Sequence, residues 1–149
     1  MKGLHCGLAF LLTAVWIAPL PAQEKVTGIG GFFFRAQDPA ALRQWYLTHL
    51  GVDLTPTSYD QKPWHQEAGP TAFNPFPKNT EYFGSPDKVW LINFRVRDLA
   101  KLVEQLRAAG IAVKVDPQEY PNGRFARLHD PEGNPIELWQ PADSSLRSE

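Results

Sequence analysis

The residues best suited to chemistry lie on either side of a short polar turn near the end of the chain. Residues 124–129 and 135–140 read as two strands, and the Asp-Pro-Glu-Gly-Asn run between them consists of strong turn formers. If the strands pair symmetrically about Glu132, Arg127 lies directly opposite Glu137, where a guanidinium would occupy the carboxylate. Such a pair could hold a polar ligand or position a proton. Alternatively, it is a cross-strand ion pair that neutralises a half-buried carboxylate.

Strand alternation predicts which other side chains share the face of this pair. Every second side chain of a strand points to the same side of the sheet. Phe125 and Trp139 therefore lie beside Arg127 and Glu137, and the remaining apolar side chains of the hairpin pack under the helices. We expect a ligand pocket with aromatic walls on the face that carries the pair.

Two earlier strand-like runs, residues 29–36 and 89–96, are rich in aromatic and β-branched side chains. The same alternation adds six positions to the predicted pocket: Gly31, Phe33, Arg35, Leu91, Asn93 and Arg95. A glycine on this face leaves room for a ligand or for a bulky neighbour. Elsewhere, His65 and Glu67 stand two residues apart on a further predicted strand and could share a face as metal ligands.

An internal repeat indicates how these strands are organised. Residues 34–42 align with residues 94–102 at an offset of 60, and the Phe, Arg, Asp, Ala and Leu of the two segments are identical. In each copy a strand-like run precedes an Asp that suits a helix N-cap, and the helix that follows closes at a Gly, Gly51 or Gly110. The sequence therefore predicts two modules of one strand, one helix and three more strands.

The predicted boundaries follow from composition. Residues 1–22 combine an early Lys, an apolar run and a Pro-Leu-Pro-Ala end, which is typical of a cleaved secretory signal. Residues 23–149 then form a single domain, with module one at about 26–76, a linker at about 77–87 and module two at about 88–141. The polar tail covers residues 142–149. We expect a secreted or periplasmic protein that does not stay in the membrane after cleavage.

Charge and cysteine content exclude other classes of protein. The chain of 149 residues has a formal net charge of -1, so it lacks the basic surface that nucleic-acid binding requires. Its single cysteine, Cys6, falls within the predicted signal, so the processed domain has no thiol for catalysis, metal binding or a disulfide.

Three segments together resemble a known family. They are residues 28–51, residues 90–111 and residues 123–141, the last reading GRFARLHDPEGNPIELWQP. The chain resembles the glyoxalase/bleomycin-resistance/dioxygenase family, the vicinal oxygen chelate (VOC) superfamily, over nearly all of the processed region. This resemblance implies an α+β fold in which two βαβββ modules form an open, cupped barrel around a ligand cavity.

The resemblance also implies where a metal would bind. Metal-dependent members place ligands at four equivalent points, on the first and last strand of each module. Here these points fall on Gly31, Leu91, Glu137 and a position near Phe73 or Asn74, so Glu137 alone matches a ligand of the family. We expect the usual four-ligand metal site to be missing. Arg35 has a separate similarity, to a first-strand Arg with which glyoxalase I enzymes hold the acidic end of their thiol cofactor.

The sequence leaves three functions open. The leading hypothesis is a VOC protein that binds a small organic molecule in an aromatic cup, without a cofactor. The second is a VOC-type lyase, isomerase or dioxygenase in which Glu137 serves as general base or as a ligand of Zn, Ni, Mn or Fe, with His65 and Glu67 as unconventional partners. The third is an interaction module whose exposed sheet edges pair with a partner or a second copy. The sequence also leaves open whether the two modules close one cup within a chain or are exchanged between the two chains of a homodimer.

Overall fold

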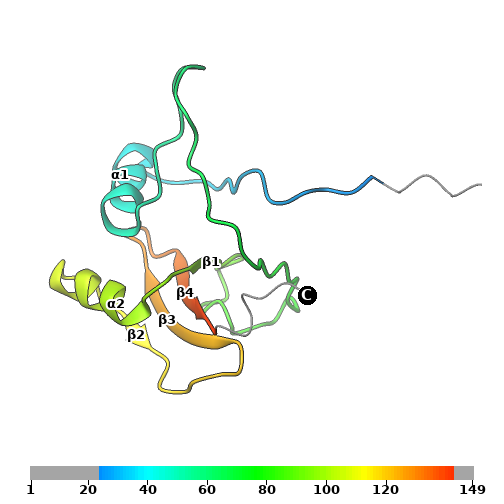
Figure 1. Ribbon diagram of the computed structural model, residues 1–149. Helices are drawn as coiled ribbons and strands as arrows, with labels where there is room; N and C mark the ends of the chain where they lie inside the picture. Colours follow the sequence, from blue (N-terminus) through cyan, green and yellow to red (C-terminus); the bar gives the residue numbers. More distant parts are fainter. Residues whose placement is uncertain (1–23, 143–149) are drawn as a thin grey trace, which may run out of the picture. The chain divides into compact units, whose positions relative to one another are not determined.

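The computed structural model describes residues 24–142, which belong to two units. The first unit, Met1–Phe33, is described over residues 24–33, and these residues contain neither helix nor strand. The second unit, Phe34–Glu149, holds the helices and strands of the described chain (Figure 1). The predicted signal, residues 1–22, and the tail beyond residue 142 lie outside the described residues. No helix within residues 24–142 is long and apolar enough to cross a membrane.

The second copy of the repeat folds as one strand, one helix and three strands, as the sequence predicted. The elements are β1 (Ile92–Arg95), α2 (Leu99–Ala108), β2 (Lys114–Val115), β3 (Gly123–His129) and β4 (Pro135–Pro141). They form a four-stranded sheet in the order β1-β4-β3-β2. β1 runs parallel to β4, whereas β4 with β3 and β3 with β2 pair antiparallel, which makes the sheet mixed.

Both helices start and end where the sequence indicates. The first helix, α1 (Pro39–Leu50), begins after Asp38, whose carboxylate accepts hydrogen bonds from two backbone N–H groups of the first turn. Gly51 ends α1 with a φ of 67°, a left-handed conformation that suits glycine. Asp98 caps α2 in the same way as Asp38 caps α1, through the backbone N–H of Lys101.

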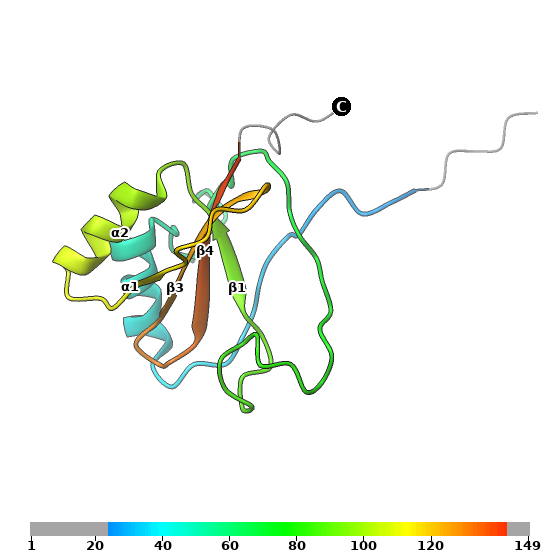
Figure 2. The same cartoon turned by 90° about the horizontal axis from the view of Figure 1, so that it is seen from below.

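The hydrophobic core lies between the helices and one face of the sheet (Figure 2). On β4, Ile136 and Leu138 are fully buried on this face, and Glu137 between them points to the opposite face. The buried side chains of the core are Leu42, Tyr46, Leu99, Val103, Leu106, Val113, Ala126, Leu128, Ile136 and Leu138. This one-sided burial leaves the other face of the sheet for a site.

The turn between β3 and β4 attaches α1 to the sheet. The Glu132 carboxylate accepts hydrogen bonds of 2.9–3.0 Å from the backbone N–H groups of Gln37 and Asp38. Asp130, which is 4% exposed, accepts a hydrogen bond of 3.0 Å from the hydroxyl of Tyr46 on α1. The Asp-Pro-Glu-Gly-Asn run therefore joins the two copies of the repeat as well as forming the hairpin turn.

The strands predicted in the first copy are absent from the described structure. Residues 29–36, 52–54, 64–67 and 71–76 are irregular, so the expected pair of explicit modules is replaced by one four-stranded sheet and two helices. A physical reason lies in their composition, because proline has no N–H for a strand ladder and glycine weakens a strand. Six prolines stand between α1 and β1: Pro56, Pro63, Pro70, Pro75, Pro77 and Pro86.

Candidate functional site

The hairpin register places Arg127 opposite Glu137, as symmetric pairing about Glu132 predicts. The guanidinium Nη2 of Arg127 lies 3.0 Å from Oε2 of Glu137, and its Nε lies 3.1 Å from the same oxygen. The Glu137 side chain is 7% exposed and that of Arg127 is 40% exposed. The carboxylate is thus buried against the sheet, while the guanidinium extends toward solvent.

The hydrogen-bonding capacity of Glu137 is filled by protein donors. Asn93, its partner in the register of β1 and β4, donates to Oε1 at 2.8 Å. The hydroxyl of Tyr82 lies 2.9 Å and 3.1 Å from the two carboxylate oxygens. With one donor from Asn93, one from Tyr82 and two from Arg127, four donors meet the roughly four lone-pair sites of an ionised carboxylate.

Tyr82 contacts both members of the Arg127–Glu137 pair. It lies in the turn-rich segment between α1 and β1, and its backbone oxygen accepts a hydrogen bond of 2.9 Å from Nη1 of Arg127. The guanidinium also stacks over the Tyr82 ring, 4.1 Å from its centroid, at the distance of a cation–π contact. Burial, and then the hydrogen bond to Glu137, raise the pKa of Tyr82, so its hydroxyl stays protonated and able to donate.

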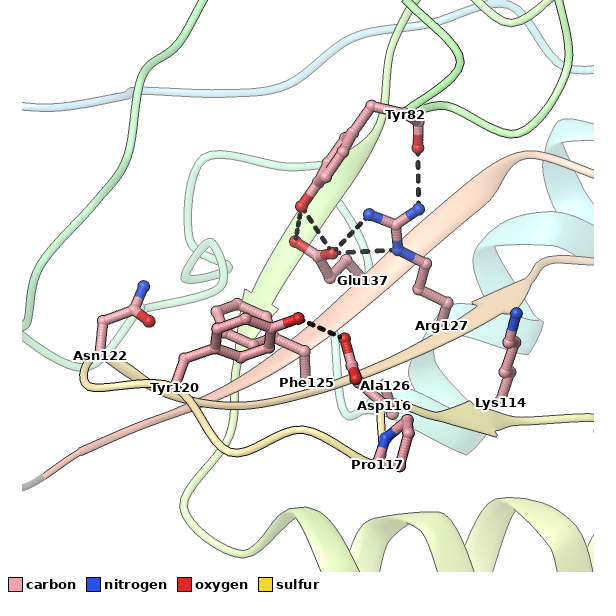
Figure 3. A pocket seen from close by; sticks show the side chains of 10 residues that line it. All are labelled: Tyr82, Lys114, Asp116, Pro117, Tyr120, Asn122, Phe125, Ala126, Arg127 and Glu137. Carbon is pink, nitrogen blue, oxygen red and sulfur yellow. Dashed lines mark hydrogen bonds and ion pairs between the residues drawn. The ribbon is translucent and has the colours of Figure 1, made fainter.

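A cavity of about 610 Å³ opens beside this network on the face of the sheet away from the helices (Figure 3). Its volume is within the range of small-molecule sites. Side chains from the strands and from the segment between β2 and β3 line it: Tyr82, Lys114, Asp116, Pro117, Tyr120, Asn122, Phe125, Ala126, Arg127 and Glu137.

One wall of the cavity is aromatic and rigidly supported. The rings of Tyr120 and Phe125 meet edge to face, with centroids 5.7 Å apart. Phe125 is in turn parallel to Trp139, at 6.2 Å and an interplanar angle of 3°. Trp139 donates its indole N–H to the backbone oxygen of Asn122 at 2.8 Å, which fixes the segment that carries Tyr120.

The opposite side of the cavity is polar. The Tyr120 hydroxyl donates to the carboxylate of Asp116 at 3.1 Å, and this hydrogen bond raises the pKa of Tyr120. The other Asp116 oxygen accepts from the backbone N–H of Gln118. Lys114 on β2 lies opposite Arg127 on β3, so two cationic side chains stand next to each other at the cavity.

Comparison with known proteins identifies the family. A sequence model of the glyoxalase-like domain matches residues 31–139, which is more than half of the chain. The chain belongs to the glyoxalase-like domain family. The resemblance to the VOC superfamily that the sequence suggested is thereby confirmed.

Several solved structures resemble this glyoxalase-like domain. A glyoxalase/bleomycin resistance protein from Streptomyces sp. CB03234 is 33% identical, with a TM-score of 0.32, 38% of this chain covered and 50% of that chain. TnmS3, an antibiotic binding protein from Streptomyces sp. CB03234, is 23% identical, with a TM-score of 0.42; the match covers 68% of this chain and 84% of that chain. The fosfomycin resistance protein FosX from Listeria monocytogenes is 19% identical, with a TM-score of 0.34; the match covers 40% of this chain and 52% of that chain. The match thus spans about half the length of the first of these proteins, and no curated protein matches the chain.

The residues of this glyoxalase-like domain do not fit the four-ligand metal set of metal-dependent members. At the equivalent positions, Gly31 and Leu91 offer no side-chain donor, and Glu137 already accepts from four protein donors. A cation there would also lie beside the guanidinium of Arg127, which opposes its binding. In residues 24–142, no three His, Cys, Asp or Glu side chains are grouped so as to hold a metal ion.

The unconventional metal ligands suggested by the sequence have other partners. A ring nitrogen of His65 lies 2.8 Å from the backbone oxygen of Pro63. The Glu67 carboxylate receives two hydrogen bonds from the Arg97 guanidinium, at 2.6 Å and 3.2 Å. Within residues 24–142, His65, Glu67 and Glu137 are not grouped as three ligands of one metal site.

The structure brings together part of the predicted pocket. Phe125, Arg127 and Glu137 line the cavity, Asn93 contacts Glu137, and Trp139 supports the aromatic wall from behind.

The other predicted positions of the second unit, Arg35, Leu91 and Arg95, do not line this cavity. Arg95 donates instead to the backbone oxygen of Glu67 at 2.7 Å. Arg35 is exposed. Gly31 and Phe33 are exposed residues of the first unit.

Sequence reasoning missed Tyr82, which lies in the segment predicted as a linker, and the lining side chains of Lys114, Asp116 and Tyr120. Tyr82 stands in a run with several aromatic residues, which a solvated linker does not require. That composition could have indicated that the segment packs against the domain. Phe76 stacks on Tyr82 at 4.8 Å, and Phe83 contacts both rings.

Proposed function

We propose that this glyoxalase-like domain binds a small organic molecule in the cavity beside Phe125 and Arg127, and that Glu137 organises the site without binding a metal. The observation that carries the proposal is the saturation of Glu137 by Asn93, Tyr82 and Arg127. A fully hydrogen-bonded carboxylate at the floor of a cavity fixes the orientation of its neighbours, and Arg127 and Tyr82 are the neighbours that face the ligand space.

A role of Glu137 as general base has less support. A base needs a lone pair that faces the substrate, whereas the four donors take up the lone pairs of this carboxylate. A metal-ligand role has the same difficulty, because a cation would have to displace Arg127 or Tyr82. We therefore assign binding, and no reaction, to this site.

A fragment screen tests the binding function. Ligand-observed NMR with a library of aromatic compounds is run on the wild-type protein and on Asn122→Trp, which places an indole at the cavity. Gln118→Trp is the matched control, because Gln118 is exposed on the same segment but does not line the cavity. We expect fragments that bind wild type and Gln118→Trp but not Asn122→Trp. Fragments that bind all three proteins equally, or none, would exclude this cavity as a binding site.

A metal titration tests the role of Glu137. Calorimetry with Zn²⁺, Ni²⁺ and Mn²⁺ compares wild type with Glu137→Gln, which keeps the shape of the side chain and removes its charge. We expect the two titrations to agree within error. Binding of one equivalent of metal that disappears in Glu137→Gln would overturn the metal-free proposal.

We also propose that the first copy of the repeat supplies a second wall of the cup. The family match begins at residue 31 and so includes both copies, and the copies share five residues at equivalent positions. Hydrogen exchange of residues 29–36 tests this: slow exchange supports a paired strand, and exchange at the rate of a free peptide contradicts it. The same measurement at two protein concentrations distinguishes a wall from the same chain from one in a second copy.

Finally, we propose that residues 1–22 are removed and that the protein acts outside the cytoplasm, in the periplasm or the medium. The charged start, apolar run and small-residue end of this segment support the proposal. Intact-mass analysis of the protein from its own host tests it, since cleavage predicts a first residue near Gln23. A mass that includes residues 1–22 would overturn it.

A further inference from the structure

Two cationic side chains of the cavity, Lys114 and Arg127, keep unused hydrogen-bond donors, and these indicate the charge of its ligand. We propose that the ligand is an aromatic acid whose anionic group binds between Lys114 and Arg127 and whose ring lies against Tyr120 and Phe125. The inference rests on the proposed binding function and adds the chemical class of the ligand to it.

The two carboxylates that line the cavity are already engaged. Glu137 accepts from four donors, as described above. Asp116 accepts from the Tyr120 hydroxyl at 3.1 Å through one oxygen and from the Gln118 backbone N–H at 3.0 Å through the other. Glu137 therefore has no lone pair left for a cationic ligand, whereas Asp116 accepts only one hydrogen bond on each oxygen and keeps some capacity. The buried carboxylate beside Arg127 is thus poorly matched to a positively charged group.

Cationic donors, in contrast, remain available. Lys114 makes no ion pair or side-chain hydrogen bond with any residue in the described part of the chain. Arg127 has five N–H groups, and its bonds to Glu137 and Tyr82 use three of them, which leaves two. An oxyanion can accept from the Lys114 ammonium and from these two N–H groups together.

The sheet register brings the two cations side by side. Lys114 and Arg127 are direct partners in the antiparallel pairing of β2 and β3, and both line the cavity. Figure 3 shows the two side chains on the same side of these strands. Like charges at directly opposed positions repel each other. Arg127 is paired with Glu137, whereas Lys114 has no ion-pair partner in the described part of the chain, although the Asp116 carboxylate lines the same cavity. An anion bound at this point would relieve the repulsion.

The aromatic wall indicates the rest of the ligand. Tyr120 and Phe125 border the same cavity as the two cations, and the stacking of Phe125 on Trp139 holds the wall in place. A planar ring gains stacking and edge contacts there at little entropic cost. A ring that carries a carboxylate at one end matches the aromatic wall and the cationic pair together.

Matched pairs of ligands test the inference. Benzoate, cinnamate, 2-naphthoate and indole-3-acetate are titrated against the full chain by NMR, each beside its uncharged carboxamide. The proteins are wild type, Lys114→Gln and the control Lys101→Gln, which removes an exposed lysine of α2 that does not line the cavity. We expect at least one acid to bind wild type about tenfold more tightly than its amide, the loss typical of one charge-assisted hydrogen bond. Lys114→Gln should reduce this difference severalfold, because only Arg127 then contacts the anion, and Lys101→Gln should leave it unchanged.

The outcomes separate this inference from the proposed function. Acids and amides that bind equally, with no effect of Lys114→Gln, would overturn the anionic ligand and leave a small-molecule site intact. A preference for acids that is undiminished in Lys114→Gln would overturn the placement of the anion. A failure of every acid and amide to bind wild type would overturn the aromatic-acid class, and the broader fragment screen with Asn122→Trp then decides the binding function separately.

Discussion

Burial should give the Arg127–Glu137 pair a larger coupling energy than an exposed pair of the same chemistry. The chain contains such an exposed pair in Arg97 and Glu67, whose side chains are 84% and 70% exposed. In both pairs a guanidinium donates two hydrogen bonds to one carboxylate, to a single oxygen of Glu137 and to the two different oxygens of Glu67. The difference between their coupling energies therefore measures what the sheet environment adds.

The magnitude follows from the exposure of the two partners. Two unit charges at 4 Å attract by about 4 kcal/mol when the effective dielectric constant is about 20. The Arg127 side chain is 40% exposed, so solvent and side-chain ordering offset roughly half of this attraction. We expect a coupling energy of about 2 kcal/mol for Arg127 and Glu137. For Arg97 and Glu67 we expect about 0.5 kcal/mol or less.

Double-mutant cycles measure both coupling energies. Arg127→Met, Glu137→Leu and the double variant are unfolded in urea beside wild type, and the same set is made at Arg97 and Glu67. We expect Arg127→Met alone to cost about 2–3 kcal/mol of unfolding free energy, since it leaves the buried carboxylate with only the donors Tyr82 and Asn93. The double variant should recover part of this loss, because no unpaired charge remains.

Equal coupling energies for the two pairs would refute the reasoning. So would a buried pair whose substitutions are additive within about 0.5 kcal/mol, because distant, independent sites behave in this way. Either result would mean that Tyr82 and Asn93 alone satisfy Glu137, and that Arg127 is oriented by the Tyr82 ring and backbone oxygen.

Three further predictions concern the attachment of α1 to the hairpin turn. Tyr46→Phe removes the donor to Asp130 and should lower the unfolding free energy by about 1–2 kcal/mol in urea at pH 7. Burial and then the charge of Asp130 raise the pKa of Tyr46, so the folded state retains a proton that the unfolded chain loses near pH 10. The unfolding free energy of wild type should therefore fall as the pH rises above about 10. That of Tyr46→Phe should fall less, and urea titrations between pH 8 and pH 11 measure both. Equal slopes in the two proteins would contradict this origin of the alkaline loss. Glu132→Ala should cost about 1 kcal/mol and speed hydrogen exchange at Gln37 and Asp38, whereas unchanged exchange at these two amides would show that the turn does not hold α1.

The sequence predicted those parts of the fold that local patterns encode. The Asp caps, the closing glycine of α1 and the strand–helix–three-strand order of the second copy follow from residue types a few positions apart. The register of the hairpin follows from its turn, and with it the contact between Arg127 and Glu137. The parallel pairing of β1 with β4 then brings Asn93 to the same carboxylate, on the face that alternation indicated.

The strands of the first copy show where local patterns fail. Aromatic runs such as residues 29–36 have strand propensity, but a strand also needs a partner edge and a continuous set of N–H donors. Prolines at intervals of a few residues remove such donors over the segment between α1 and β1. Propensity and repeat similarity predicted strands there, and the described structure does not pair them.

The tertiary structure alone decided the contact of Tyr82 with Glu137 and the lining of the cavity by Lys114 and Tyr120. Tyr82 is 55 residues away along the chain, in a turn-rich segment whose irregular conformation has no period from which a facing direction can be derived. Lys114 and Tyr120 likewise enter the cavity through a two-residue strand and a loop, too short for alternation to indicate a face. Sequence by itself determined the buried acid and its arginine, because a hairpin turn sets both positions within ten residues. The donors that complete the carboxylate and the side chains that shape the cavity depend on how distant segments pack, and local periodicity carries no information on that packing.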